Sequence, residues 1–146
     1  MATQLTRTPT PTLPAARARP YPRAENLQIY AVSVDDADLT LAPAEPFAGI
    51  RLAYQPGLSV GIDAPSFCGQ PYEALVKHLA AVDLRQHLLT PTQVDDIALA
   101  LDAALDKMLP YAFRAWGLRL DEVQMLARWF AACASEGYYV HGWWGE

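Results

Sequence analysis

Cysteine and long apolar runs are scarce in this sequence, and their scarcity excludes several classes of protein. The 146 residues include two cysteines, Cys68 and Cys133, which are too few for a disulfide scaffold. We expect two reduced thiols, as in a cytoplasmic protein, with a single bridge between them as the alternative. No stretch approaches the roughly 18 apolar residues that a membrane-spanning helix needs, and the N-terminus lacks the apolar core of a secretory signal.

The motifs of several common catalytic and ligand-binding sites are also missing. The sequence contains no glycine-rich phosphate loop, no serine nucleophile elbow and no paired-carboxylate motif. No cysteine or histidine pair has the spacing of a zinc site, since His78 and His87 would lie on opposite faces of one helix. We therefore expect neither a metal nor a cofactor, and a protein that is not an enzyme.

Basic residues are scarce outside the N-terminal segment. Residues 1–24 contain four arginines and no acidic residue, whereas residues 25–146 carry 7 basic and 16 acidic side chains. The N-terminal segment therefore has a net charge of +4 and the remainder −9, which gives −5 overall. Because nucleic-acid binding depends mainly on neutralising phosphates, the remainder is a poor surface for DNA or RNA. Nucleic-acid binding through the N-terminal segment alone is kept as an alternative.

A change in composition coincides with this boundary in charge. Residues 1–24 hold five prolines and little that a hydrophobic core would bury. Such a segment favours extended, polyproline-like conformations and becomes ordered only on contact with another surface. We interpret residues 1–24 as an extended arm and residues 25–146 as a single domain, which is long enough to bury a sizeable core.

The first part of the domain has the pattern of β-strands. Leu27–Val34 is rich in β-branched and aromatic residues and predicts a strand that ends at the aspartates of Asp35–Asp38. Ile50–Tyr54 and Leu58–Ile62 alternate apolar with polar or small residues around a proline–glycine turn, which predicts a hairpin. The connecting residues 43–46 and 63–70 are expected to be loops.

Helical patterns dominate the second part, and Thr90–Leu109 is the clearest of them. Thr90 is a typical N-cap, Pro91 occupies the first helical position, and Gln93 completes a capping box. Apolar residues then recur at the helical period until Pro110, which ends the pattern: Val94, Ile97, Ala98, Leu101, Leu105 and Met108.

Three further segments complete the predicted fold. A helix is expected from Pro71 at least to Val82, with Leu89 as an alternative end, and a short helical turn over Tyr111–Trp116 ends at Gly117. A second capping box over Asp121–Gln124 predicts a helix that ends at Gly137, and residues 138–144 are expected as a strand or a hydrophobic flap. The predicted class is α+β, with a small antiparallel sheet packed against three or four helices.

One combination of residues suggests catalysis. Cys68 precedes the helix predicted from Pro71, whose N-terminus would favour a thiolate. His141 is a candidate base, with Asp63 or another acid to orient it. A thiol-dependent hydrolase is therefore the alternative function. Against it, the residues around Cys68 match no motif of a thiol enzyme.

The preferred interpretation is a non-enzymatic protein-binding module. Asp95, Asp102 and Asp106 line up along one helix, and a row of this kind is a solvated face or a contact for a basic partner. Tryptophan is enriched at interface hot spots, and the acidic and basic clusters complement each other in charge. The candidate partner-binding residues are Arg17, Arg19, Arg23, Asp35, Asp36, Asp38, Asp95, Asp102, Asp106, Trp143 and Trp144.

The expected partner is another protein rather than a membrane or a nucleic acid. The chain would be a subunit of an assembly, or a small acidic inhibitor that docks on a larger, basic, nucleic-acid-handling protein and presents carboxylates where phosphates would bind. Contact between the arm and a second copy would give a homo-oligomer.

Overall fold

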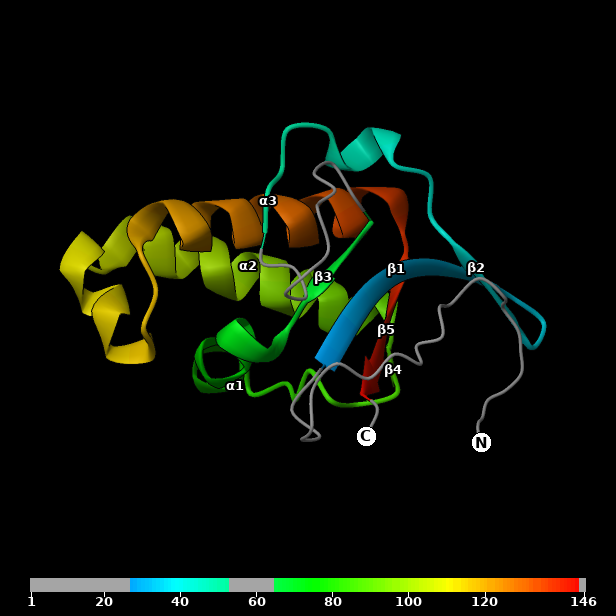
Figure 1. Cartoon of the computed structure of the whole chain (residues 1–146), viewed down its shortest axis with the longest axis horizontal. Coiled ribbons are helices and arrows are strands. Elements are labelled where there is room, and N and C mark those ends of the chain that lie inside the picture. The colour runs from blue at the N-terminus through cyan, green and yellow to red at the C-terminus, as the bar shows by residue number, and fades with distance from the viewer. Residues whose placement is uncertain (1–26, 53–64, 145–146) are drawn as a thin grey trace.

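The computed structural model describes residues 27–52 and 65–144, without the side chain of Trp144. Over these residues it is an α+β fold, in which a five-stranded antiparallel sheet packs against helices, as predicted (Figure 1). The arm and most of the hairpin predicted within Ile50–Ile62 lie outside the described residues. The described part of that hairpin, Ile50–Leu52, has no strand.

The sheet is built around its first strand, β1 (Leu27–Asp35), which confirms the strand predicted there. One side of β1 pairs with β5 (Tyr139–Trp144), whose outer side pairs with the short β4 (Leu88–Leu89). The other side pairs with β2 (Asp38–Leu41) and, nearer the start of β1, with β3 (Ser66–Cys68). All four pairings are antiparallel, so β5 lies inside the sheet and is the predicted strand rather than a flap.

Two elements correct the loops predicted in the first half of the chain. The three-residue β3 lies within the predicted loop 63–70, because Phe67 enters the core and its neighbours pair with β1. A 3-10 helix, η1 (Glu45–Phe47), lies where residues 43–46 were expected as loop, and it buries Phe47. Both elements are too short to show a periodic pattern in the sequence.

The helix predicted from Pro71 is shorter than expected. The 3-10 helix η2 (Gln70–Tyr72) leads into α1 (Glu73–Ala80), and Ala81 then adopts a left-handed conformation with φ of 58°. The prediction of a helix at least to Val82 is therefore wrong. The following segment turns back toward the sheet, where β4 pairs with β5.

Helix α2 (Pro91–Lys107) begins where the sequence predicts, since Thr90 and Gln93 form both hydrogen bonds of the capping box. The 3-10 helix η3 (Pro110–Trp116) confirms the predicted turn, and Gly117 ends it with φ of 75°. Helix α3 (Leu120–Glu136) ends at Gly137 as predicted.

The start of α3 differs from the prediction. The residue before its first turn is Arg119, and the Glu122 carboxylate accepts a hydrogen bond of 2.8 Å from the backbone N–H of Arg119. The capping box predicted over Asp121–Gln124 is therefore wrong. Both patterns have an acidic or amide side chain at the third helical position, so the sequence alone does not distinguish the two starts.

The three α-helices pack on one face of the sheet, here called the inner face. Leu27, Ile29 and Val140 from this face join one hydrophobic cluster with side chains of α1, α2 and α3. The ring of Phe67 meets the ring of Trp129 edge-on at 4.7 Å between centroids. Figure 1 shows α2 and α3 side by side, with β3 crossing in front of them. No helix within the described ranges is long and apolar enough to cross a membrane.

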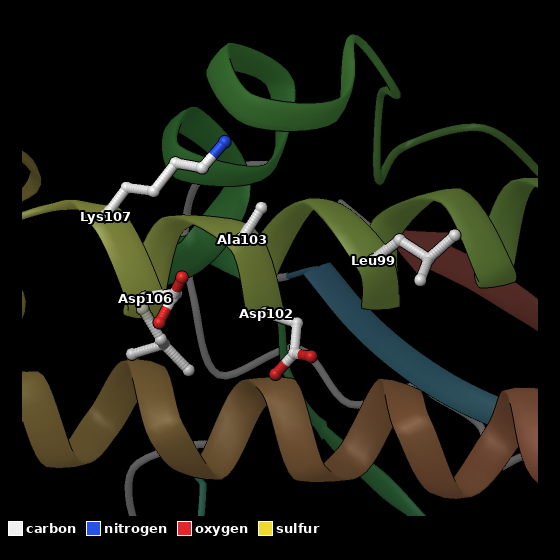
Figure 2. Close-up of a pocket in the computed structure, with 6 residues that line it drawn as sticks. Leu99, Asp102, Ala103, Asp106 and Lys107 are labelled. Carbon is white, nitrogen blue, oxygen red and sulfur yellow. The ribbon is translucent and has the colours of Figure 1, made fainter.

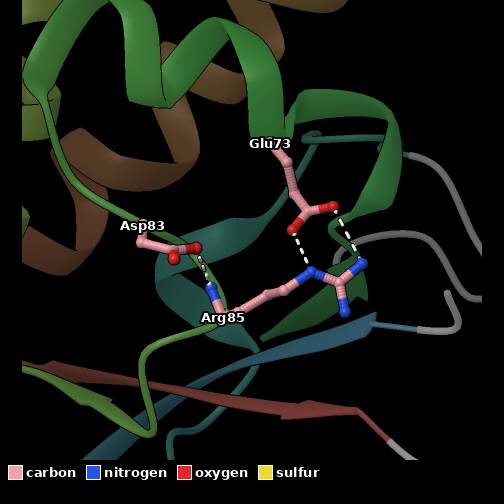
Figure 3. Close-up of polar contacts among 3 residues, drawn as sticks. All are labelled: Glu73, Asp83 and Arg85. Carbon is pink, nitrogen blue, oxygen red and sulfur yellow. Dashed lines mark hydrogen bonds and ion pairs between the residues drawn. The ribbon is translucent and has the colours of Figure 1, made fainter. Parts of the chain in front are cut away.

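An ion pair fixes the segment between α1 and β4. Arg85 donates to both carboxylate oxygens of Glu73, from Nε at 2.6 Å and from Nη2 at 3.1 Å (Figure 3). The backbone N–H of Arg85 also donates to Asp83. This two-pronged geometry orients the chain as well as neutralising the charge. It therefore holds residues 83–87 between the start of α1 and the sheet.

Glycine is required where this segment meets β5. A Cβ at Gly142 would lie 2.5 Å from the carbonyl oxygen of Leu84 and 3.0 Å from that of Gln86. Only the absence of a side chain allows the two backbones to approach this closely. The contact brings the backbone of His87 next to β5, where its carbonyl oxygen accepts a hydrogen bond of 3.2 Å from the N–H of Gly142.

Candidate protein-binding surface

The aspartates predicted as a row on one helix lie on the exposed side of α2. Asp95, Asp102 and Asp106 are spaced by seven and four residues, which places them on one face of the helix. All three are exposed. Leu99 lies within the same row, four residues after Asp95, and is 62% exposed. We call this set of four residues the acidic face of α2.

A groove between α2 and α3 borders the acidic face of α2. It has a volume of about 390 Å³ and opens to solvent. Asp95, Leu99 and Asp102 line it from α2, and small side chains line it from α3. These small side chains leave open space beside the carboxylates. The residues from α3 are Ala127, Ala131, Ala134 and Ser135.

A second hollow continues along α2 toward its C-terminus. Asp102, Asp106 and Lys107 line it together with Leu99, and its volume is about 540 Å³. In Figure 2 the Asp102 side chain extends toward α3, whereas Lys107 extends away from both carboxylates. Both hollows are open depressions rather than enclosed cavities. They differ in this from the sites of small molecules, which proteins usually enclose.

The charges of this face are not neutralised by neighbouring side chains. Within residues 27–52 and 65–144, Asp95, Asp102 and Asp106 form no ion pair or side-chain hydrogen bond. The ion pairs described for this part of the chain join Glu73 to Arg85 and Asp121 to Arg119, both away from this face. The carboxylates are therefore available to a cation from outside the described domain.

The other predicted acidic cluster lies elsewhere, in the hairpin that joins β1 to β2. Asp35 and Asp38 face each other across the two-residue turn, and Asp36 adopts a left-handed φ of 61°. All three are exposed. In Figure 1 this hairpin projects at the opposite end of the molecule from η3 and the C-terminus of α2. The structure therefore does not unite the two acidic clusters in one site.

The remaining predicted residues are dispersed or not described. Trp143 is half-buried on β5, opposite Gln28 of β1, and the backbone of Trp144 ends the same strand. Arg17, Arg19 and Arg23 lie outside the described residues.

The proposed nucleophile and base are on strands that do not adjoin. Cys68 on β3 is opposite Gln28, and His141 on β5 is opposite Tyr30, so β1 runs between them. Strands in a sheet are about 4.8 Å apart, which separates the two backbones by about 10 Å. Asp63, the candidate orienting acid, lies outside the described residues.

The Cys68 thiol and the His141 imidazole also lack the protonation states of a catalytic thiolate–imidazolium pair. Burial raises the pKa of the Cys68 thiol, although the start of a helix was expected to lower it. The Nδ1–H of His141 donates to the carbonyl oxygen of His87 at 2.8 Å, and burial lowers the pKa of this imidazole to about 4. At neutral pH the thiol is therefore protonated and the imidazole uncharged. The geometry gives the hydrolase alternative no support.

Comparison with known proteins gives no related protein from which a function could be inferred. No family model, curated protein or solved structure matches the chain. Among the described residues, no three acidic, histidine or cysteine side chains are grouped as a metal site would need. Both cysteines are buried and free.

The sequence predicts the aspartates of α2 as contact residues but does not single out the residues that the structure places between and beside them. Leu99 could have been found, because its spacing from Asp95 and Asp102 puts an apolar residue within the acidic row. The alanines of α3 could not, because only the packing of α3 against α2 brings them to the groove.

Proposed function

We propose that this chain is a non-enzymatic protein-binding module that docks on a basic partner through the acidic face of α2. The observation that supports this most directly is the presence of three exposed carboxylates, without ion pairs in the described domain, around the exposed side chain of Leu99. Surface leucines are common singly, but one flanked by unpaired charges and bordered by a groove has the composition of a small interface.

The two kinds of side chain have different roles in this proposal. The carboxylates attract and orient a partner rich in arginine or lysine, and this attraction weakens as salt increases. Leu99 and the alanine-lined groove supply the apolar contact that is removed from water on binding. The partner class is a basic protein in the cytoplasm, either the neighbour of this subunit in an assembly or a nucleic-acid-handling protein that the chain inhibits.

The test is capture of partners from a lysate of the source organism by three immobilised forms of the full chain. The first is the wild type, the second carries Asp95→Asn, Asp102→Asn and Asp106→Asn, and the third carries Asp35→Asn, Asp36→Asn and Asp38→Asn. The two variants lose the same number of charges. We expect the α2 variant to lose most of the partner, by on the order of tenfold in affinity, and the hairpin variant to retain it.

Quantitative mass spectrometry compares the proteins recovered at low and at moderate salt. Equal recovery by all three forms would contradict the proposal. Selective loss with the hairpin variant would also contradict it, because the contact would then belong to the β1–β2 turn. Leu99→Ser, which keeps every charge, is expected to weaken capture at moderate salt, where the apolar contact contributes the larger share.

A further inference from the structure

The face of the sheet opposite the helices, here called the outer face, carries a group of aromatic side chains. Residues that are paired across antiparallel strands point to the same side, so Tyr30 shares a face with His141, Val32 with Tyr139, and Gln28 with Trp143. Tyr30 and His141 have stacked rings with centroids 6.0 Å apart. Because the side chains alternate along β1, none of these belongs to the inner face.

The side chains at the centre of the outer face are buried, although the helices lie on the other side of the sheet. Tyr30 is 5% exposed, Val32 0% and His141 1%. None of the three belongs to the hydrophobic cluster that the helices form with the inner face. From the described part of the chain, His87 reaches the outer face and covers one end of it, where its ring meets His141 at 4.7 Å. The three α-helices lie on the other face, so they do not provide the cover at the centre.

We propose that residues 1–26 of the same chain provide this cover and bind across the outer face as an extended segment. They lead directly into β1, the strand that contributes Tyr30 and Val32 to the centre of the face. An extended segment of this length spans roughly 80 Å at about 3.1 Å per residue. The sheet is about 15 Å wide at 4.8 Å per strand spacing. The segment is therefore long enough to reverse direction and cross every strand.

The composition of the two surfaces supports this pairing. Residues 1–26 hold five prolines and four arginines. Proline-rich segments bind in extended form to aromatic surfaces, since they need no internal hydrogen bonds, and guanidinium groups stack on aromatic rings. The outer face offers Tyr30, Tyr139 and Trp143, and the opposite net charges of the arm and the domain favour the same contact.

A buried hydrogen-bond acceptor on the outer face also suits binding of residues 1–26. The side chain of Gln28 hydrogen-bonds with that of Tyr30, but its Oε1 atom is buried and has no hydrogen-bond partner among the described residues. A buried acceptor of this kind costs free energy unless a donor reaches it. Arginine side chains and backbone N–H groups are the donors that residues 1–26 supply. Binding in the same chain is favoured over binding to a second copy because the short connection to β1 gives a high effective concentration.

The test uses the full chain and limited trypsin digestion, because the arm contains its own cleavage sites. Cleavage after Arg17 and Arg23 is timed by mass spectrometry and compared with cleavage of a synthetic peptide of residues 1–26. If the arm is bound, we expect cleavage in the full chain to be about tenfold slower or more, because the protease acts only on the dissociated fraction. Cleavage at the same rate in both would overturn the proposal.

Variants distinguish the outer face from a general effect. Trp143→Ala and Tyr139→Ala, each of which removes an aromatic ring from the outer face, are expected to speed cleavage after Arg17 several-fold. Tyr111→Ala removes a ring that is 64% exposed on η3 and is expected to leave the rate unchanged. Equal acceleration by all three would overturn the proposal. Thermal unfolding of each variant is measured in parallel.

A variant of the arm keeps the test valid if a strand variant fails to fold. Pro14→Gly with Pro22→Gly leaves every residue of the domain in place and is expected to speed cleavage after Arg17, because the segment loses its preference for the extended form. No acceleration would contradict the proposed mode of binding. Protection that decreases when the protein is diluted would show that the segment occupies the face of a second copy instead.

Discussion

At the scale of single residues, His141 shows how the fold determines the charge of a side chain. Its Nδ1–H donates to the backbone of His87, which leaves Nε2 as the basic nitrogen of a neutral ring. Desolvation opposes protonation and lowers the pKa of His141 from its ordinary value of 6.5 to about 4. The imidazole is therefore a neutral part of the sheet surface rather than a general base near neutral pH.

This pKa predicts how stability depends on pH. Between pH 6.5 and pH 4 the unfolded chain binds a proton at His141 that the folded chain does not, so the free energy of unfolding falls as the pH is lowered. We expect a loss of about 3 kcal/mol across this range from His141 alone. The measurement is urea unfolding at a series of pH values.

His141→Asn is the matched control for this prediction. The asparagine amide retains a donor for the His87 carbonyl but does not titrate, so its stability should change less between pH 6.5 and pH 4. Parallel pH profiles for the variant and the wild type would show that the dependence arises from other groups.

At the scale of elements, α2 depends on the hydrogen bonds at its start. The hydroxyl of Thr90 accepts from the N–H of Gln93 at 3.3 Å, and the amide oxygen of Gln93 accepts from the N–H of Thr90 at 3.0 Å. Together they satisfy two backbone donors that the first helical turn would otherwise leave unpaired. The helix that carries the acidic face is thus anchored next to β4.

We expect Thr90→Ala to destabilise the protein by about 1 kcal/mol, because it removes one of these two acceptors. Thr92→Ala is the control, since Thr92 is exposed within the first turn of α2 and has no role in the capping box. Thermal or urea unfolding of both variants provides the measurement. If Thr92→Ala lowered the free energy of unfolding as much as Thr90→Ala does, the effect would not come from the capping hydrogen bond.

At the scale of the whole molecule, the two proposed contacts use opposite sides of the fold. The acidic face of α2 lies in the helical layer, and the outer face lies on the far side of the sheet from the helices. A partner on one of them therefore does not cover the other. The cationic arm and a basic partner need not compete for the same carboxylates.

This arrangement predicts that the two contacts are independent. Trypsin should cleave the variant with Asp95→Asn, Asp102→Asn and Asp106→Asn after Arg17 at the wild-type rate. The Trp143→Ala variant should capture the wild-type amount of partner. Distant sites without shared residues usually show additive effects. If the α2 triple variant frees the arm, the arginines bind the acidic face of α2 rather than the outer face. The paired readouts, trypsin digestion and partner capture, therefore separate failure of one proposal from failure of the other.

Elements whose signals are local could be predicted from the amino-acid sequence. The start of α2 follows from Thr90, Pro91 and Gln93, and the ends of η3 and α3 follow from glycines that adopt a left-handed φ of 75°. Helical period, caps and glycine positions involve residues a few positions apart, so their physics is contained in a short window. The charge difference between the arm and the domain is likewise a property of the sequence alone.

Features that depend on residues far apart in the chain could not be predicted in this way. β3 and β4 have three and two residues, too few for a pattern, and each is a strand because β1 or β5 supplies its hydrogen bonds. The same pairing puts β1 between Cys68 and His141, and the packing of α3 brings small residues beside Asp95 and Asp102. Side chains far apart in the chain become neighbours only when the whole core forms, since a strand has no internal hydrogen bonds of its own.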